Sequence, residues 1–275
     1  MASKSSSGIL FFGCGKMGYA ILSGLLKSGL DKGRVRVVEV DADIRKKLEA
    51  EGVACAENPS GFGGFSPGVV LLAVKPFLVE KILDDVKPFA RKNAAVLSIV
   101  AGKKIGWFAE KLGEKTPVFR AMPNTPALVG EGIAAVADNG LASKEQREMV
   151  SQLFKACGDV IFLDDESLID AVTALSGSGP AYVFYMTEAL AQAGKALGLS
   201  EEFAQKLARA TVSGAGALMK RSGESPETLR RNVTTPNGTT ERALNVLMDE
   251  QNGLAPLLAH ALKEACKRSK ELGES

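Results

Sequence analysis

The sequence contains a single histidine, His260, and its four cysteines, Cys14, Cys55, Cys157 and Cys266, lie far apart with no CxxC pair. Ser-His-Asp and Cys-His catalysis and multi-histidine metal sites are therefore not expected, and no metal site is predicted. Scattered cysteines indicate reduced thiols in an intracellular protein and argue against a disulfide framework. The chemistry must run without these residues.

The sequence also lacks a large excess of charge of either sign, and it lacks long apolar runs. The 275 residues carry 34 basic and 32 acidic side chains and are 45% apolar, which is typical of a globular protein. No run of like charges suggests a nucleic-acid arm or a membrane patch, and no apolar segment reaches membrane-spanning length. The polar opening, residues 1–7, lacks the apolar core of a signal peptide, and we expect a short disordered tail there. A cytoplasmic protein with small-molecule partners is expected.

The first recognisable motif lies in residues 8–30, where a short apolar stretch leads through Gly13-x-Gly15-x-x-Gly18 into an amphipathic segment. In this fingerprint the first glycine makes a tight turn, the second admits a pyrophosphate, and the third lets helix and strand pack closely. A second predicted strand, residues 35–41, ends in acidic residues at the usual offset. The pattern predicts a dinucleotide-binding Rossmann domain.

Alternation of strands and helices continues to about residue 165 and predicts an α/β domain with a parallel sheet. Further predicted strands lie near Val53 and at 69–74, 95–100, 118–121, 132–137 and 160–163, with helices at 42–51, 78–91, 104–112 and 144–156. From Ser167 onward no strand is expected, and helices are predicted at 180–198, 201–221, 240–249 and 255–272. We therefore divide the chain into a dinucleotide-binding domain, 1–165, and an all-helical domain for substrate binding and dimerisation, 166–275.

The helix predicted at 180–198 places Met186, Leu190, Ala193 and Leu197 along one face and small residues elsewhere. Small residues let helices approach closely, so this helix is expected to be buried between others, those of a second subunit included. A tightly packed bundle within one chain is the alternative.

Residues 232–240, Asn-Val-Thr-Thr-Pro-Asn-Gly-Thr-Thr, precede apolar residues at helical spacing. The free N–H groups at a helix start, with neighbouring hydroxyls, suit a carboxylate or a phosphate. An ordinary Thr-capped helix start is the alternative. A nicotinamide enzyme can work without histidine on an electrophilic substrate such as a protonated imine, because the cofactor brings the hydride.

Six segments together resemble pyrroline-5-carboxylate reductases, in the order of that family: residues 12–18, 73–76, 98–102, 120–126, 174–182 and 232–240. The resemblance implies reduction of 1-pyrroline-5-carboxylate to L-proline by NADPH or NADH, the last step of proline biosynthesis, in a cytoplasmic oxidoreductase. It also implies a helical domain that interlocks with a second subunit as a homodimer, with a larger ring of dimers also open.

Carried over by motif, the resemblance implies cofactor contacts at Phe12, Gly13, Cys14, Gly15, Lys16, Met17, Asn58, Ala73, Val74, Lys75, Pro76, Val100, Ala101 and Asn232. The loop that carries Asn58 is one residue longer here than in that family. The residues implied to bind the substrate carboxylate are Thr235, Gly238, Thr239 and Thr240, with Asn232 where cofactor and substrate meet. Thr240 matches the residue beside the ring nitrogen and is the catalytic candidate.

For several motifs, and for the function, the sequence allows more than one interpretation. Pro123 and Pro126 either shape a turn or contact a ligand, and residues 176–180 suit a structural helix start. For Lys75, which precedes a proline, we expect the backbone to be the contact. Another Rossmann-type imine or β-hydroxyacid reductase is the alternative enzyme, and a nucleotide sensor without turnover is the alternative of another class.

The end of the second predicted strand bears on cofactor choice. Glu39 and Asp41 are expected on the same side by the strand's period of two. A carboxylate there can bind the ribose 2′-hydroxyl of NADH and would repel the 2′-phosphate of NADPH, so NADH is favoured. Arg45 could offset that repulsion. The alternative is that both acids are exposed and point away from the cofactor.

Overall fold

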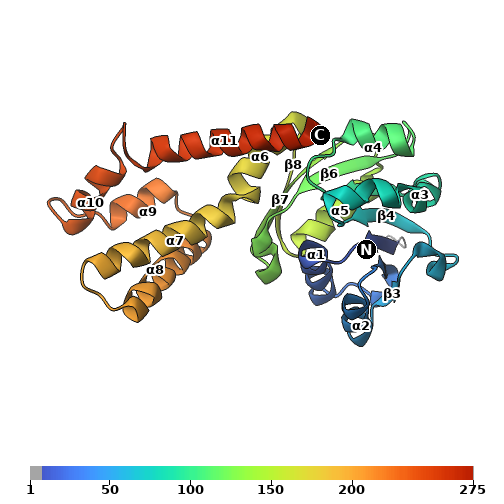
Figure 1. Ribbon diagram of the computed structural model, residues 1–275, viewed down its shortest axis with the longest axis horizontal. Coiled ribbons are helices and arrows are strands. Elements are labelled where there is room, and N and C mark those ends of the chain that lie inside the picture. Colours follow the sequence, from blue (N-terminus) through green and yellow to red (C-terminus); the bar gives the residue numbers. More distant parts are fainter. Residues whose placement is uncertain (1–7, 275) are drawn as a thin grey trace. The chain divides into compact units, whose positions relative to one another are not determined.

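The computed structural model describes residues 8–274, so the tail expected at residues 1–7 lies outside the described chain. The chain forms two compact units, each described here by itself (Figure 1). The first unit runs through Gly177 and resumes at Cys266, and the second runs from Ser178 to Ala265. No helix among residues 8–274 combines the length and apolar content that a membrane span needs.

The first unit is an α/β unit with one eight-stranded sheet in its described residues. The strands are β1 Gly8–Phe12, β2 Val35–Val38, β3 Ala54–Ala56, β4 Pro67–Leu72, β5 Ala95–Ser98, β6 Val118–Met122, β7 Gly132–Asp138 and β8 Gly158–Phe162. The α-helices are α1 Lys16–Lys27, α2 Ala42–Ala50, α3 Val79–Ala90, α4 Ile105–Leu112, α5 Lys144–Lys155 and α6 Ile169–Val172. Short helices η1 Lys32–Arg34, η2 Pro59–Phe62, η3 Pro76–Leu78, η4 Thr125–Val129 and η5 Glu166–Leu168, and the π-helix η6 Thr173–Gly177, connect them.

The strands lie in the order β3-β2-β1-β4-β5-β6-β7-β8. β1 pairs in parallel with β2 on one side and with β4 on the other, so the chain reverses its direction of strand addition after β3. Ligands of such sheets bind at this switch point, beyond the carboxyl ends of the strands. The glycine-rich segment directly follows β1 and therefore lies at this point.

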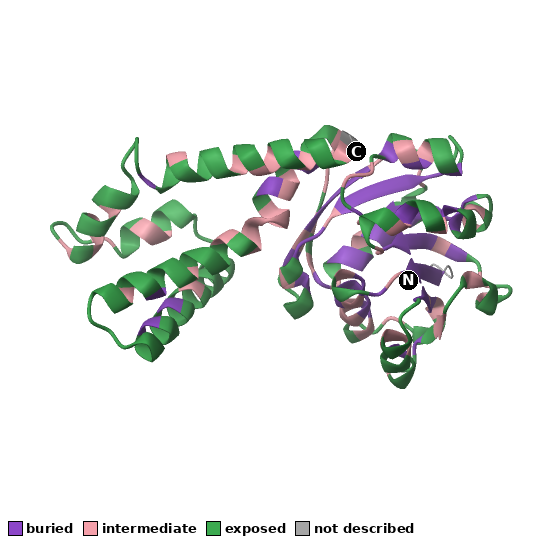
Figure 2. Ribbon diagram, viewed as in Figure 1, coloured by how far each residue is buried: buried purple, intermediate pink, exposed green. Residues whose placement is uncertain are grey.

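Both faces of the sheet are buried, as the near-continuous aliphatic strands predict. Along β1, Ile9 and Phe11 join the core that includes residues of α1 and α5, whereas Leu10 and Phe12 join the core that includes residues of α3 and α4. Helices thus cover the two faces of the sheet (Figures 1 and 2). The strands therefore lie between two layers of helices.

One strand departs from the predicted parallel sheet, because β7 pairs antiparallel with β6. Only residues 123–131, which include η4, join the two strands. A parallel crossover needs a connection of about a dozen residues or more, usually with an α-helix, so this short link enforces a reversal. β8 follows α5 and pairs in parallel with β7.

The second unit is helical throughout its described residues, as predicted. Its helices are α7 Gly179–Ala196, α8 Glu201–Ser222, α9 Pro226–Asn232, α10 Thr239–Leu247 and the first part of α11 Leu254–Glu274. α9 was not predicted from the sequence; it spans 7 residues, too few for an apolar repeat, and begins with a Ser225 cap and Pro226. The buried apolar cluster of the second unit consists of Ala191, Ala204 and Ala208, from α7 and α8.

The compact units divide later than the predicted boundary at residue 165. α6 packs on β6 and β7, which keeps residues 166–177 with the sheet. The last turns of α11 also belong to the first unit, where Ser269 Oγ donates a 2.6 Å hydrogen bond to Asp170 Oδ1 on α6. In the sequence, the second unit is thus inserted between two segments of the first. The predicted division at residue 165 assigned all residues after it to the second domain.

Candidate functional site

The glycine-rich turn after β1 has the backbone that the fingerprint predicts. Gly13 has φ +85°, and a Cβ there would lie 2.8 Å from the carbonyl oxygen of Ala73. A Cβ on Gly18 would lie 3.0 Å from the carbonyl oxygen of Gly13 and 3.2 Å from Ala73 Cβ. Gly13 therefore makes the tight turn, and Gly18 allows close packing of α1 on the sheet. Next to Gly15 there is open space.

The start of α1 can accept an anion. Its N-cap, Gly15, forms no side-chain hydrogen bond, and the first turn contains no acidic residue. The unpaired N–H groups of such a turn and the dipole of the 12-residue helix attract a phosphate. Lys16, the first helical residue, is exposed and adds positive charge. These residues fit the pyrophosphate of a dinucleotide, which would lie over the open space beside Gly15.

Glu39 follows β2 and points to the glycine-rich turn. Its Oε2 accepts a 2.7 Å hydrogen bond from the backbone N–H of Cys14, and its Oε1 accepts a 3.1 Å bond from the N–H of Asp41. The Glu39 side chain is buried, with 8% exposure, so the alternative that both acids are exposed is wrong for this residue. Arg45 Nη1 donates a 2.7 Å hydrogen bond to the Glu39 backbone carbonyl.

Asp41 does not lie beside Glu39 as the strand period predicts. β2 ends at Val38, so the alternation does not extend to residue 41. Asp41 is instead the exposed N-cap of α2, and its Oδ1 accepts hydrogen bonds from the N–H groups of Asp43 and Ile44. Only Glu39 presents its carboxylate to the glycine-rich turn.

The segments after β4 and β5 form the neighbouring part of this edge. Ala73 N–H donates a 2.8 Å hydrogen bond to the Phe12 carbonyl, and Val74 Cγ1 lies 2.9 Å from the position of a Cβ on Gly13. Lys75 is exposed, with Nζ 5.9 Å from the Phe77 ring centroid, and Pro76 opens η3. Val100 is buried and Ala101 is exposed. The structure thus brings Phe12 and Gly13 together with Ala73 and Val74.

Two further predicted residues have local roles. The Asn58 Oδ1 caps η2 by accepting hydrogen bonds from Ser60, and the side chain is exposed. Pro126 lies in the first turn of η4, which favours the turn-shaping interpretation of this proline. Asn124, given no role from the sequence, is buried: its Nδ2 donates to the Ser176 carbonyl (3.1 Å), and its Oδ1 accepts from Ile133 N–H (2.9 Å).

In the second unit, the Thr-rich segment leads into α10 without a side-chain cap. Gly238, not a threonine, is the N-cap, so the alternative of a Thr-capped helix start is wrong. Gly238 N–H donates 3.0 Å to the Thr235 carbonyl, and a Cβ on Gly238 would lie 2.9 Å from that oxygen. Asn237 has φ +59°, and its N–H donates 2.8 Å to Glu241 Oε2.

The hydroxyl groups of this segment are available. Within residues 8–274, no hydrogen bond engages the hydroxyls of Thr235, Thr239 or Thr240, whereas Thr234 Oγ1 donates 2.6 Å to the Arg230 carbonyl. Thr239 and Thr240 are the first two residues of α10, where backbone N–H groups have no partner within the helix. Asn232 ends α9 and its Nδ2 donates 3.3 Å to Glu224 Oε2. The segment therefore offers hydroxyl and N–H donors to an anion.

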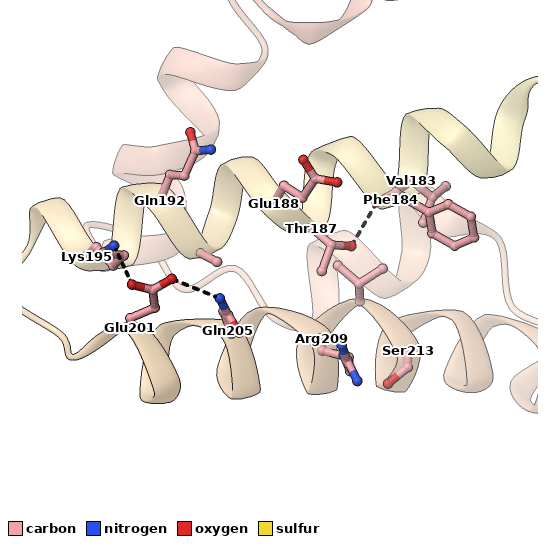
Figure 3. A pocket seen from close by; sticks show the side chains of 12 residues that line it. Val183, Phe184, Thr187, Glu188, Gln192, Lys195, Glu201, Gln205, Arg209 and Ser213 are labelled. Carbon is pink, nitrogen blue, oxygen red and sulfur yellow. Dashed lines mark hydrogen bonds and ion pairs between the residues drawn. The ribbon is translucent and has the colours of Figure 1, made fainter.

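A groove of about 910 Å³ lies along α7 and α8 (Figure 3). Three of its polar side chains bond to one another: Glu201 accepts from Lys195 Nζ at 2.9 Å and from Gln205 Nε2 at 3.3 Å. None of the site residues predicted from the sequence lines it. On the same helices, large apolar side chains are exposed, among them Phe184 (62%), Tyr185 (70%) and Phe203 (65%). Exposed apolar area of this kind is typical of a protein interface.

Family models match both parts of the chain. Residues 166–272 match the model described as pyrroline-5-carboxylate reductase dimerisation, and residues 8–102 match the one described as NADP oxidoreductase, coenzyme F420-dependent. The pyrroline-5-carboxylate reductase of Pseudomonas aeruginosa is 38% identical over 270 residues, 98% of either chain.

Solved structures agree. A pyrroline-5-carboxylate reductase from Coxiella burnetii has a TM-score of 0.92 at 34% identity and covers 98% of this chain and 100% of its own. That of Plasmodium falciparum, solved with NADP bound, has a TM-score of 0.81 at 28% identity, with 98% and 100% covered. Together with the glycine-rich turn and the Thr-rich segment, these similarities establish that the chain belongs to the pyrroline-5-carboxylate reductase family.

Proposed function

We propose that this chain reduces 1-pyrroline-5-carboxylate to L-proline with a nicotinamide dinucleotide, the last step of proline biosynthesis. The observation that carries the proposal is a pair of helix starts without side-chain caps, α1 at the glycine-rich turn and α10 behind the Thr-rich segment. The first suits a pyrophosphate and the second a carboxylate. Membership of the reductase family supports the same substrate.

The proposed reaction needs few protein groups. A bound nicotinamide would supply the hydride for the imine carbon, and the nitrogen would keep the proton with which the protonated imine arrives. The C=N bond becomes CH–NH, and no side chain has to be an acid for the hydride step. The N–H groups and hydroxyls of Thr239 and Thr240 would bind the substrate carboxylate, and the Thr240 hydroxyl would hold the ring nitrogen in place.

The test is reduction of the cyclic imine by the purified protein. With the cyclic imine added, the absorbance of NADH or NADPH should fall and proline should accumulate in equal amount. Turnover of β-hydroxyacids but not of the imine would favour the alternative reductase. Cofactor binding without turnover of either substrate would favour the nucleotide sensor.

For the cofactor, we propose that NADH is preferred to NADPH. The Glu39 carboxylate is held at the glycine-rich turn by two backbone N–H groups, so it cannot easily turn away from a ribose bound there. A fixed carboxylate accepts a hydrogen bond from a 2′-hydroxyl and repels a 2′-phosphate. Arg45, bonded to the Glu39 carbonyl, is the cation that could oppose this preference. The P. falciparum relative shows that NADP is accommodated within the family.

For the assembly, we propose a homodimer formed through α7 and α8. The predicted apolar face of α7 is not packed within the described unit, since Met186 is 42%, Leu190 46% and Leu197 87% exposed. The alternative of a bundle within one chain leaves this face unexplained. Light scattering separates a dimer from a larger ring of dimers. A cytoplasmic location, which the resemblance implies, stays a prediction.

A further inference from the structure

The loop between β5 and α4, residues 99–104, is the feature from which this inference starts. If the proposed function holds, Val100 and Ala101 in this loop line the nicotinamide half of the cofactor. Hydride transfer depends steeply on geometry, so whatever fixes this loop also affects the reaction.

Side chains hold the loop at its two ends. At its start, Val100 N–H donates a 3.2 Å hydrogen bond to the hydroxyl of Ser98, which is fully buried at the end of β5. At its end, Lys104 is the N-cap of α4 and provides no side-chain cap. The cap comes from Glu166 in η5, whose Oε1 accepts a 2.9 Å hydrogen bond from Ile105 N–H across 61 residues of sequence.

Arg120 fixes Glu166 in turn. The Arg120 Nη1 donates a 2.9 Å hydrogen bond to the same Oε1, and the Arg120 side chain is 4% exposed. Arg120 lies in β6 directly beside Ser98, so both ends of the loop are tied to one point of the sheet. Its Nε is buried without a hydrogen-bond partner. Glu166 is therefore the group that compensates this buried charge, and its loss is costly.

The middle of the loop is restricted by backbone packing. Gly102 has φ +88°, and a Cβ there would lie 2.6 Å from the carbonyl oxygen of Leu272 in the last turns of α11. This part of α11 belongs to the first unit. The loop is thus confined at its start, its middle and its end.

We propose that Glu166 is a positioning residue for the reaction, because it joins Arg120 to the start of α4 and so sets the path of residues 99–104. Glu166 itself touches neither substrate nor cofactor in this proposal. It acts through the backbone of Ile105 and the buried guanidinium of Arg120. The proposal rests on the proposed function, which places the nicotinamide at this loop.

A matched control lies in the neighbouring strand β7, where Asp138 pairs with Phe119 of β6. Asp138, at the end of the antiparallel strand β7, also accepts one backbone N–H, from Gly140 at 2.8 Å, and one arginine, Arg147 at 2.9 Å. Glu166→Gln and Asp138→Asn therefore each remove one carboxylate charge that pairs with one arginine and one backbone N–H, although Arg147 is 47% exposed and Arg120 only 4%. Only the first pairing involves the loop after β5.

The experiment compares Glu166→Gln, Glu166→Ala and Asp138→Asn in the full-length protein, at a temperature where circular dichroism shows each to be folded. The readouts are the cofactor dissociation constant from NADH and NADPH fluorescence, kcat, and the KM values for the cofactor and for the imine. We expect a loss of kcat over cofactor KM of about tenfold for Glu166→Gln, and up to about 100-fold for Glu166→Ala. The loss is smaller in Glu166→Gln because the amide oxygen can still accept the hydrogen bond from Ile105 N–H. Asp138→Asn should match the wild type within about twofold, since its partners, Gly140 and Arg147, lie outside the loop.

Wild-type cofactor affinity and turnover in both Glu166 variants would overturn the proposal and leave Glu166 a role in stability alone. An equal loss in Asp138→Asn would also overturn it, since the effect would then follow from general destabilisation. If the wild type binds the dinucleotide but reduces no imine, the proposed substrate is wrong. The dissociation constants of the variants still test the positioning role in that case.

Discussion

The carboxylate of Glu39 accepts a 2.7 Å hydrogen bond from the backbone N–H of Cys14, in the middle of the glycine-rich turn. This bond places a buried negative charge at the point where the dinucleotide loop meets the end of β2. Rossmann proteins place there the acid that binds the ribose 2′-hydroxyl. The cofactor preference should therefore depend on this single side chain.

We predict that Glu39→Ser shifts the ratio of kcat/KM for NADPH to kcat/KM for NADH upward by about tenfold or more, equivalent to about 1.4 kcal/mol. The substitution removes the repulsion of a 2′-phosphate and one acceptor for the 2′-hydroxyl. Steady-state kinetics with both cofactors measure the ratio. A wild type that prefers NADPH tenfold would show that Arg45 or another cation outweighs Glu39.

Asp41→Asn is the control for that substitution. Asp41 is close in sequence and acidic, but its carboxylate caps α2. Asparagine is about as good a cap as aspartate, so the fold should hardly change. The ratio of kcat/KM for NADPH to kcat/KM for NADH should also stay near the wild-type value. If any nearby negative charge set the cofactor preference, removal of the Asp41 charge would raise this ratio as well.

The second prediction concerns turnover. Thr240→Ala should lower kcat by about 100-fold, the low end for a positioned proton-bearing group, without abolishing activity. Cofactor affinity should change little, because the residue lies in the proposed carboxylate site on α10. Pre-steady-state and steady-state assays at saturating cofactor measure the loss. Thr234→Ala is the comparison, since its hydroxyl is already bonded to the Arg230 carbonyl and should not affect kcat.

The sequence predicted the sheet well because its strands are continuous aliphatic runs, such as 69–72 and 95–98, which need burial on both faces. It misplaced Asp41, because where a strand ends and a cap begins is decided by hydrogen bonds to the next helix. The pairing of Ile105 with Glu166 could not be predicted, since it joins residues 61 apart and leaves no periodic pattern. The N-cap of α10 is Gly238 and the residue before it, Asn237, has a positive φ, and residue composition predicts neither.

The third prediction tests the assembly. Ala193 on α7 is exposed, whereas Ala191 is 8% exposed and packs against Ala204 of α8. Ala193→Trp should weaken the dimer, because overpacking an interface typically costs about 1–3 kcal/mol. Ala191→Leu should lower the stability of the unit instead. Light scattering over a dilution series and thermal unfolding separate the two effects, and an active wild-type monomer at micromolar concentration would contradict the proposed dimer.

The last prediction concerns pH and the buried thiol beside Glu39. Burial, with a smaller contribution from the Glu39 carboxylate, raises the pKa of Cys14 to about 12 from 9.0. In the unfolded chain the thiol loses its proton near its ordinary pKa, while in the folded protein it keeps it. Between these two values the folded protein binds more protons, so the free energy of unfolding falls as pH rises, by roughly 1.4 kcal/mol per pH unit for one such group. Below about pH 8.5 this contribution is fully present. Cys14→Ala removes it, so the difference in unfolding free energy between wild type and variant, measured by urea denaturation, should be constant up to about pH 8.5 and shrink above it. A difference that stays constant to pH 10.5 would show that the thiol ionises equally in both states, and that it is not shielded in the glycine-rich turn.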